Sequence, residues 1–308
     1  MATSGSTDWS ATGDSIVRGA QRLLGKRDRE ADTTFMTEAL ESLNGISRAW
    51  QAKGLYLWKI RDITVFLEDD AQYYDVGPTG DEAAIEPAKT DITTAAVLGA
   101  ATIVVDSVTG IATTYVIGVE LDDGSIQWTT VNGAPVSTTV TLTAVTTDTV
   151  AAKNNVYAYS ALPAKPVKVL SARYINSSEE ERELWVASRE EYMQMPDKTE
   201  TGECIMVYPD MRTTDIRIYT WPTCDNVKER IVLTVRIPPD DFDASTNNAD
   251  FPPEWTRALK YNLAVELAPE YEVEPSEYLL YMAKITREEV ENADVEASSV
   301  TFSADTEY

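Results

Sequence analysis

The chain of 308 residues contains no histidine. This absence excludes Ser-His-Asp and Cys-His nucleophile systems, imidazole general bases and every zinc site that contains histidine. There are two cysteines, Cys204 and Cys224, and no second pair that would complete a metal cage. In a chain so poor in cysteine we expect both to be reduced, structural thiols. The composition therefore predicts a protein without a metal or another cofactor.

Long apolar runs are also missing. The most apolar segment, from Ala95 to Val105, is far too short to cross a bilayer, which takes about 20 residues. The N-terminal stretch MATSGSTDWS is polar and lacks the hydrophobic region of a signal peptide. We therefore expect no membrane among its partners and a protein that is made and folded in a cytoplasm.

Positive charge is scarce. The chain has 26 Lys and Arg against 51 Asp and Glu, which gives a formal net charge of −25. Such a surface repels phosphate and anionic lipid, so it disfavours sequence-specific binding of nucleic acid. The charge either keeps the protein soluble or provides a negative surface that DNA passes without binding. The composition is compatible with both interpretations. The hydrophobic fraction of 43% is that of a folded globular protein.

One basic cluster stands out near the N-terminus. Its members are Arg18, Arg22, Lys26, Arg27 and Arg29. Two of them, Arg18 and Arg22, are four residues apart and share a face of the expected helix. The cluster is either a solvated face balanced by neighbouring acids or a docking site for an acidic partner. The acidic C-terminal portion of a neighbouring copy is one such partner.

The pattern of elements changes twice along the chain. Up to about residue 60 it is helical, with two amphipathic segments that end at Gly25 and Gly54. From about residue 80 to 166 it is rich in Thr, Val and Ala, with five short strand-like runs and no helix signal. The third region has strand-like runs, followed by a helix from about Pro253 to Ala268 that is apolar on nearly all its sides. A last helix begins near Pro275, and the tail after it contains a short β-prone piece at Val300, Thr301 and Phe302.

These regions predict an α+β fold with a helical core, flanking antiparallel strands, and an inserted small all-β barrel or sandwich domain. The expected division is a discontinuous core of residues 1–79 and 167–308 and an insertion of residues 80–166. We expect the core to contain Leu40, Leu43, Trp50, Leu55, Trp58, Trp255, Leu259 and Leu263.

Carboxylates are abundant, so pairs of them occur by chance. In DFDASTNNAD, Asp241, Asp243 and Ser245 match the first positions of a calcium loop, but Thr246 replaces the required glycine and Pro252 the final glutamate. Glycoside hydrolysis needs two carboxyls about 5 to 9 Å apart and works without His or Cys. A tail-associated, carboxylate-dependent hydrolase of cell wall or polysaccharide therefore stays an alternative, as does a carbohydrate-binding module formed by residues 80–166.

Three separated motifs carry a resemblance to a known family. The first, ALESLNGISRAWQAKGLYLW, contains Ala39, Leu40, Leu43, Asn44, Trp50, Gly54, Leu55, Leu57 and Trp58 at the family's spacing. The second is SREEYMQMPDKTETG with IYTWPTC, and the third is DFPPEWTRALKYNLAVELAPEY, from Asp250 to Tyr271. Together they resemble the head-to-tail adaptor proteins of short-tailed phages, which are also called tail accessory, head-completion or packaged-DNA stabilisation factors. Residues 80–166 depart from the compact members of that family.

The resemblance implies a structural virion protein that is not an enzyme. Such adaptors form a ring, usually a dodecamer, below the portal at one capsid vertex, where they close the filled head, extend the DNA channel and seat the tail. The implied partners are the portal protein, the tail nozzle or hub, tail fibre or spike proteins, further copies of the chain, and DNA that passes without specific binding. We expect the portal contact at the basic cluster, at Val300–Phe302, or at both.

Overall fold

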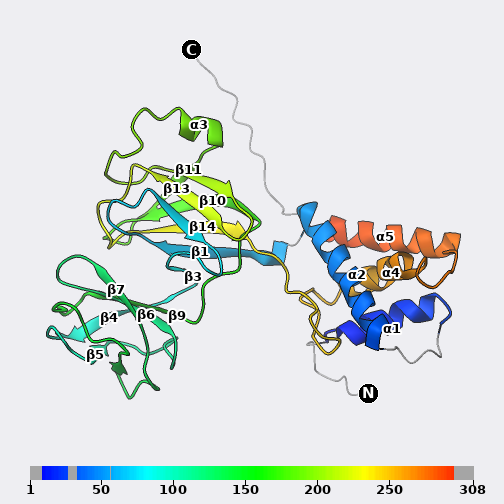
Figure 1. Cartoon of the computed structure of the whole chain (residues 1–308), viewed down its shortest axis with the longest axis horizontal. Coiled ribbons are helices and arrows are strands. Elements are labelled where there is room, and N and C mark those ends of the chain that lie inside the picture. The colour runs from blue at the N-terminus through cyan, green and yellow to red at the C-terminus, as the bar shows by residue number, and fades with distance from the viewer. Residues whose placement is uncertain (1–8, 27–32, 56, 295–308) are drawn as a thin grey trace, which may run out of the picture. The chain divides into compact units, whose positions relative to one another are not determined.

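The computed structural model describes residues 9–26, 33–55 and 57–294 (Figure 1). The chain divides into two compact units. The terminal unit combines Met1–Lys59 with Pro238–Tyr308, and the middle unit is Ile60–Ile237. The boundaries expected at residues 80 and 166 both fall inside the middle unit. The division into a core and an insertion stays a prediction, and each unit is described by itself.

The terminal unit is built from four helices that come from both ends of the chain. They are α1 (Gly13–Leu23), α2 (Thr33–Ala52), α4 (Trp255–Leu267) and α5 (Glu277–Ala293), with a short 3-10 helix at Leu57–Lys59. Helix α4 contacts each of the other three helices (Figure 1). It begins at Trp255, two residues after the expected Pro253, and its apolar side chains are buried on several sides, as its sequence predicts.

Local sequence explains where these helices begin and end. Thr12 caps α1, because its Oγ1 accepts a hydrogen bond from the Ser15 amide at 3.2 Å, and Ser276 caps α5 in the same way. Helix α2 ends just before Gly54, whose φ of 88° lies in the left-handed region that favours glycine. Helix α4 has no side-chain cap, and Asp250 upstream of it makes a different contact, described below.

The larger sheet of the middle unit has eight strands. These are β1 (Ile60–Phe66), β2 (Tyr73–Val76), β3 (Ala83–Ile85), β10 (Lys168–Ile175), β11 (Glu181–Val186), β12 (Met206–Met211), β13 (Ile216–Trp221) and β14 (Arg230–Arg236). Their order is β2-β13-β12-β11-β10-β14-β1-β3, and the pairs are antiparallel except for β11 with β12. Alternate residues such as Ile63, Val65, Ile231 and Leu233 form an apolar core on one face of this sheet. A short helix, α3 (Arg189–Met193), follows β11.

The smaller sheet has six antiparallel strands. These are β4 (Ala88–Thr94), β5 (Thr102–Val105), β6 (Val116–Glu120), β7 (Ile126–Thr130), β8 (Thr139–Thr141) and β9 (Asn155–Tyr159), in the order β7-β6-β9-β4-β5-β8. A bridge between Val131 and Leu142 joins the ends of the two outer strands, so the sheet curls around its own apolar cluster. The two sheets meet at Phe66 of β1, whose ring centroid lies 4.8 Å from that of Trp128 and 4.9 Å from that of Tyr157.

The expected α+β fold with a helical core and flanking strands is wrong. The described part of the chain is mostly β, and its strands form sheets of eight and six, each with an apolar cluster of its own. The helices do not form a core that the strands cover; they form a separate unit. The physical reason is that a large sheet can curl and bury one of its own faces. Strands that pair across long sequence separations therefore form an apolar core without a helix packed on that face.

Candidate functional site

Three indoles from separate segments meet in the terminal unit. Trp50 of α2 and Trp58 of the 3-10 helix both contact Trp255 at the start of α4, with ring centroids 5.6 Å and 5.0 Å apart. Phe251 lies 6.0 Å from both Trp58 and Trp255. Trp50 and Trp255 are each 4% exposed. We call these four residues the indole cluster, and it joins the first motif of the resemblance to the third.

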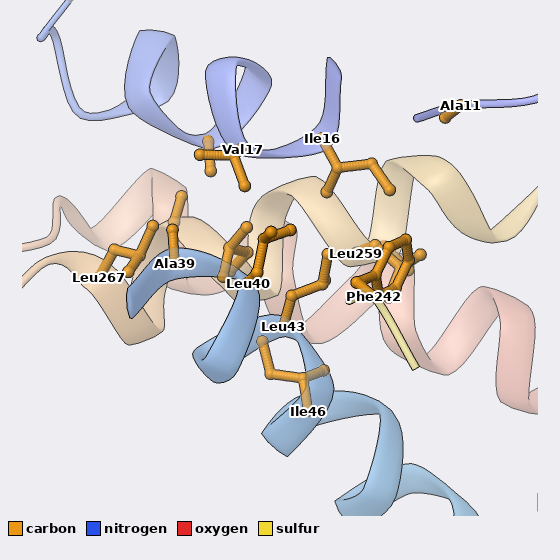
Figure 2. Packing of buried hydrophobic residues seen from close by; sticks show 14 of the residues in the cluster. Ala11, Ile16, Val17, Ala39, Leu40, Leu43, Ile46, Phe242, Leu259 and Leu267 are labelled. Atoms are coloured by element: carbon orange, nitrogen blue, oxygen red, sulfur yellow. The ribbon is translucent and has the colours of Figure 1, made fainter. Parts of the chain in front are cut away.

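The other expected core residues lie in the same apolar core. Leu40 and Leu43 of α2 and Leu259 and Leu263 of α4 are buried there, and Leu55 and Trp58 are partly buried against it. Figure 2 shows Leu40, Leu43 and Leu259 pointing toward one another between α2 and α4. Trp58 lies in the 3-10 helix that precedes β1.

A buried ion pair holds the end of this 3-10 helix. Lys59 is 7% exposed and pairs with the Asp250 carboxylate, whose Oδ2 also accepts a hydrogen bond from the Asp240 amide at 2.9 Å. The Trp58 Nε1 donates to the Asp250 carbonyl oxygen at 3.4 Å. The sequence analysis missed this role of Lys59 and Asp250, because nothing in their local pattern links positions so far apart. Together these bonds fix the segment that carries Trp58.

The second motif has two parts, and they lie side by side in the middle unit. The Trp221 Nε1 donates to the Asp197 carbonyl oxygen at 2.7 Å. The Thr223 amide donates to the Glu200 carbonyl and the Gly202 amide to the Thr223 carbonyl, each at 2.8 Å. At the start of the motif Ser188 caps α3 in a reciprocal capping box with Glu191. The two parts of the second motif therefore pack on each other in the middle unit, whereas the first and third motifs meet in the terminal unit.

The basic cluster is only partly described. Arg27, Arg29 and Val300–Phe302 lie outside the described residues, so their roles stay predictions. Arg18 pairs with Asp14 at 2.8 Å on the exposed face of α1. Lys26 lies over the Tyr271 ring, 6.0 Å from its centroid. The described cations therefore do not act as one surface: two of the three are engaged within the terminal unit, and Arg22 is the exception.

Arg22 has a cationic neighbour that the sequence analysis missed. Lys260 of α4 is half-buried, and its pKa is lowered by burial and then by the charge of Arg22. A Cβ added at Gly19 would lie 2.9 Å from the Lys260 Cδ, so the lysine stem runs against α1 at that glycine. One signal was available, since Lys260 is the single lysine in a helix that is apolar on nearly all its sides.

Acidic residues gather elsewhere on the same unit. Burial raises the pKa of Glu270, and the charges of Glu38 and Glu266 raise it further. All three side chains are exposed, and they come from α2, α4 and the turn after α4. The sequence shows many acids here, but it does not show that these three lie together.

A carboxylate-dependent hydrolase would need two suitably placed carboxyl groups. Glu82 lies beside an aromatic cluster: it accepts a hydrogen bond from the Tyr159 hydroxyl, and burial and the charges of Glu68 and Asp81 raise its pKa. The segment compared with a calcium loop instead holds the start of α1: the Ser245 and Asn247 carbonyl oxygens accept hydrogen bonds from the Asp14 and Gly13 amides, respectively. In the described ranges no group of three or more His, Cys, Asp or Glu is placed to hold a metal ion.

The thiols and the helices add two further observations. Cys204 and Cys224 are both free and buried, as expected, and burial raises the pKa of each thiol to about 11. Neither thiol is therefore a ready nucleophile at neutral pH. None of the helices in the described residues is both long and apolar enough to span a bilayer.

Comparison with known proteins adds no relative. No model of a protein family matches this chain, and no curated protein matches it.

Proposed function

We propose that this protein is a head-to-tail adaptor of a short-tailed phage. In this proposal copies of the chain, twelve in the form that the resemblance implies, make a ring below the portal at one capsid vertex. The ring closes the filled head, extends the DNA channel, and seats the tail nozzle or hub and the fibre or spike proteins. The protein is then a part of the virion and performs no catalysis.

The indole cluster is the observation that carries the proposal. The resemblance rests on motifs that are separated in sequence, and two of them meet in one buried contact of Trp50, Trp58 and Trp255. Burying three indoles contributes several kcal/mol at about 25 cal/mol per Å². Such a contact should make the terminal unit rigid, and a ring under pressure from packaged DNA requires rigid subunits.

The charge of the chain supports the same role. A formal net charge of −25 on each copy would give a channel through the ring a negative lining. DNA is a polyanion, so it would pass such a lining without being held. A protein that binds DNA tightly would need the opposite sign.

The test is to mix the purified chain with the portal ring encoded in the same genome and to image the mixture by electron microscopy. The proposal expects an added ring of density, coaxial with the portal. A chain that stays a single subunit beside an unchanged portal ring contradicts it. An assay for reducing ends released from peptidoglycan or capsule covers the hydrolase alternative; release that a Glu82→Gln variant abolishes would favour that alternative.

A further inference from the structure

A cleft of about 630 Å³ lies in the middle unit beside the smaller sheet. Its walls come from the end of β3, the start of β4, the end of β9 and two loops, which include residues 109–115 and 160–164. The volume is within the range of about 300–1,000 Å³ that ligand pockets have. Glu86 is the single charged residue among the lining residues, all of which lie in the described ranges. We call this hollow the Glu86 cleft.

One wall of the Glu86 cleft is backbone without partners. Residues 160–164 follow β9, and in the described part of the chain their amide and carbonyl groups make no hydrogen bond. Such groups need water or a ligand as their partner. Pro163 in this segment is buried, and its ring fixes one backbone angle. The segment therefore offers donors and acceptors to a polar molecule in the cleft.

An aromatic side chain forms another part of the wall. Tyr115 is half-buried and packs against the apolar cluster of the smaller sheet. Its amide donates to the Ala112 carbonyl at 3.2 Å, and its carbonyl accepts from the Val131 amide at 2.8 Å. The Tyr115 hydroxyl has no hydrogen-bond partner among the described residues, whereas the Tyr159 hydroxyl donates to Glu82. Tyr115 therefore provides a fixed ring and a hydroxyl that remains available.

Glu86 has an uncommon backbone conformation. It stands between β3 and β4, and its φ of 47° lies in the left-handed region that side chains other than glycine seldom adopt. Backbone strain of this kind persists where the surrounding fold fixes a residue, and it is concentrated at ligand sites. The Glu86 side chain is exposed and makes no ion pair within the described ranges. Its two carboxylate oxygens are therefore available as acceptors.

A neutral sugar matches these groups. Its hydroxyls would donate to Glu86 and pair with the backbone of residues 160–164, while the C–H groups of one face would pack on the Tyr115 ring and Leu162. An anionic ligand would find no cation among the lining residues. A wholly apolar ligand would leave the polar groups unpaired. An extended peptide would pair with the backbone, but it lacks neighbouring hydroxyls for the two carboxylate oxygens.

We propose that the Glu86 cleft binds a neutral oligosaccharide, in which Glu86 accepts hydrogen bonds from sugar hydroxyls and the Tyr115 ring packs on a sugar face. The sequence leaves a carbohydrate-binding module open for residues 80–166, and the cleft gives that hypothesis a defined place. The inference goes beyond the proposed function and does not depend on it, because a ring of adaptors forms with or without a sugar.

The test is saturation-transfer-difference NMR on the full-length chain. The neutral probes are cellotriose, maltotriose and chitotriose, the anionic probe is trigalacturonate, and the peptide probe is an uncharged, acetylated pentapeptide. Ala161→Trp places an indole in the cleft from an exposed lining position. Ala134→Trp is the matched control, since Ala134 is exposed in the turn after β7 and does not line the cleft. Thermal unfolding first confirms that each variant is folded.

At least one neutral probe should bind with a Kd of about 1 mM or less, and trigalacturonate should not bind. Ala161→Trp should abolish this binding, and Ala134→Trp should retain it. Glu86→Gln should weaken it about tenfold, because a neutral amide accepts weaker hydrogen bonds than a carboxylate does. Tyr115→Phe, which removes the hydroxyl alone, should weaken it less than Tyr115→Ala, which removes the ring.

Three results overturn the inference. The first is that none of the neutral probes binds. The second is that a probe binds equally well to the unmodified chain and to Ala161→Trp, which places the site elsewhere. The third is that the pentapeptide binds in the cleft and no sugar does. None of these results bears on the assembly with the portal ring, so the adaptor proposal is judged separately.

Discussion

Both units of the protein contain ion pairs, but these pairs join different parts of the chain. In the middle unit, which is one continuous stretch, Arg217 pairs with Asp75 at 2.6 Å and the buried Glu120 pairs with Lys228 at 2.7 Å. In the terminal unit Arg18 pairs with Asp14 on one helix, whereas Lys59 pairs with Asp250 from the other end of the chain. The terminal unit therefore depends on contacts between its two chain segments.

The cores of the two units differ in the same sense. The middle unit is one continuous stretch, and its sheets are joined by aromatic contacts around Phe66 and by ion pairs around Glu179. The terminal unit must bring both ends of the chain together, and the indole cluster is where they meet. Loss of one buried indole should therefore damage the terminal unit more than loss of an exposed indole damages the middle unit.

The largest expected effect is that of Trp50→Ala. Removing this buried indole leaves a cavity between α2 and α4 and should lower the free energy of unfolding of the terminal unit by about 3–5 kcal/mol. Hydrogen exchange followed by mass spectrometry across a denaturant series would report the loss in α2 and α4 separately from the strands.

Trp185→Ala is the matched control, because Trp185 of β11 is 51% exposed. We expect its loss to change the stability of the middle unit by about 0.5 kcal/mol or less. If Trp50→Ala cost no more than Trp185→Ala, the central role of the indole cluster would be refuted.

A smaller effect is expected where the smaller sheet packs on the larger one. A Cβ at Gly118 of β6 would lie 2.5 Å from the Trp128 ring, so Gly118→Ala must displace the indole that contacts Phe66. We expect a loss of about 1–3 kcal/mol, confined to the middle unit. Thermal unfolding with tryptophan fluorescence would measure it, and unchanged stability would show that Trp128 moves aside freely.

Acid should weaken the ion pairs around Glu179. Hydrogen bonds from Arg230 and Lys89 hold the pKa of Glu179 at about 2, below its ordinary value of 4.5. Because the folded-state pKa is the lower one, this contribution is complete above about pH 4.5 and is lost as the pH falls toward 2. The Glu179 side chain is 47% exposed, so we expect about 1 kcal/mol at most.

The measurement is the stability of the middle unit against pH, for the unmodified chain and for Glu179→Gln. The variant should be less stable at neutral pH, and the two curves should converge in acid. Parallel curves over this range would mean that Glu179 contributes nothing to the contact.

The smallest effect should be a gain. Gly45 lies inside α2, and a Cβ added there meets no atom within 4 Å. Gly45→Ala should therefore stabilise the terminal unit by about 0.5–1 kcal/mol, because alanine loses less backbone freedom on folding. Chemical denaturation checks it, and a loss of stability would show that the helix needs the glycine.

The comparison also shows which features the sequence could predict. The end of α2 before Gly54 follows from the glycine, and the start of α4 near Pro253 follows from the proline and the 3.6-residue spacing, which are local patterns. The buried α4 follows from apolar residues on nearly all its sides. The strands from β5 to β9 and from β10 to β14 were visible as short strand-like runs, whereas β4 and α3 were not predicted.

What the sequence could not provide was long-range pairing. Nothing local says that β1 pairs with β14, or that β2 lies beside β13, and those pairings turn scattered strands into a sheet with its own core. The same limit hid the ion pair of Lys59 with Asp250 and the approach of Arg22 to Lys260. Each depends on two residues that meet only after the chain ends have come together.

The most direct test of the adaptor account is the mass of the complex that the purified chain forms with its portal ring, measured by native mass spectrometry. The account predicts one species in which a full ring of copies, twelve by the resemblance, is added to the portal. A spectrum that contains only the free portal and single copies of the chain, at every ratio and salt concentration, would contradict it.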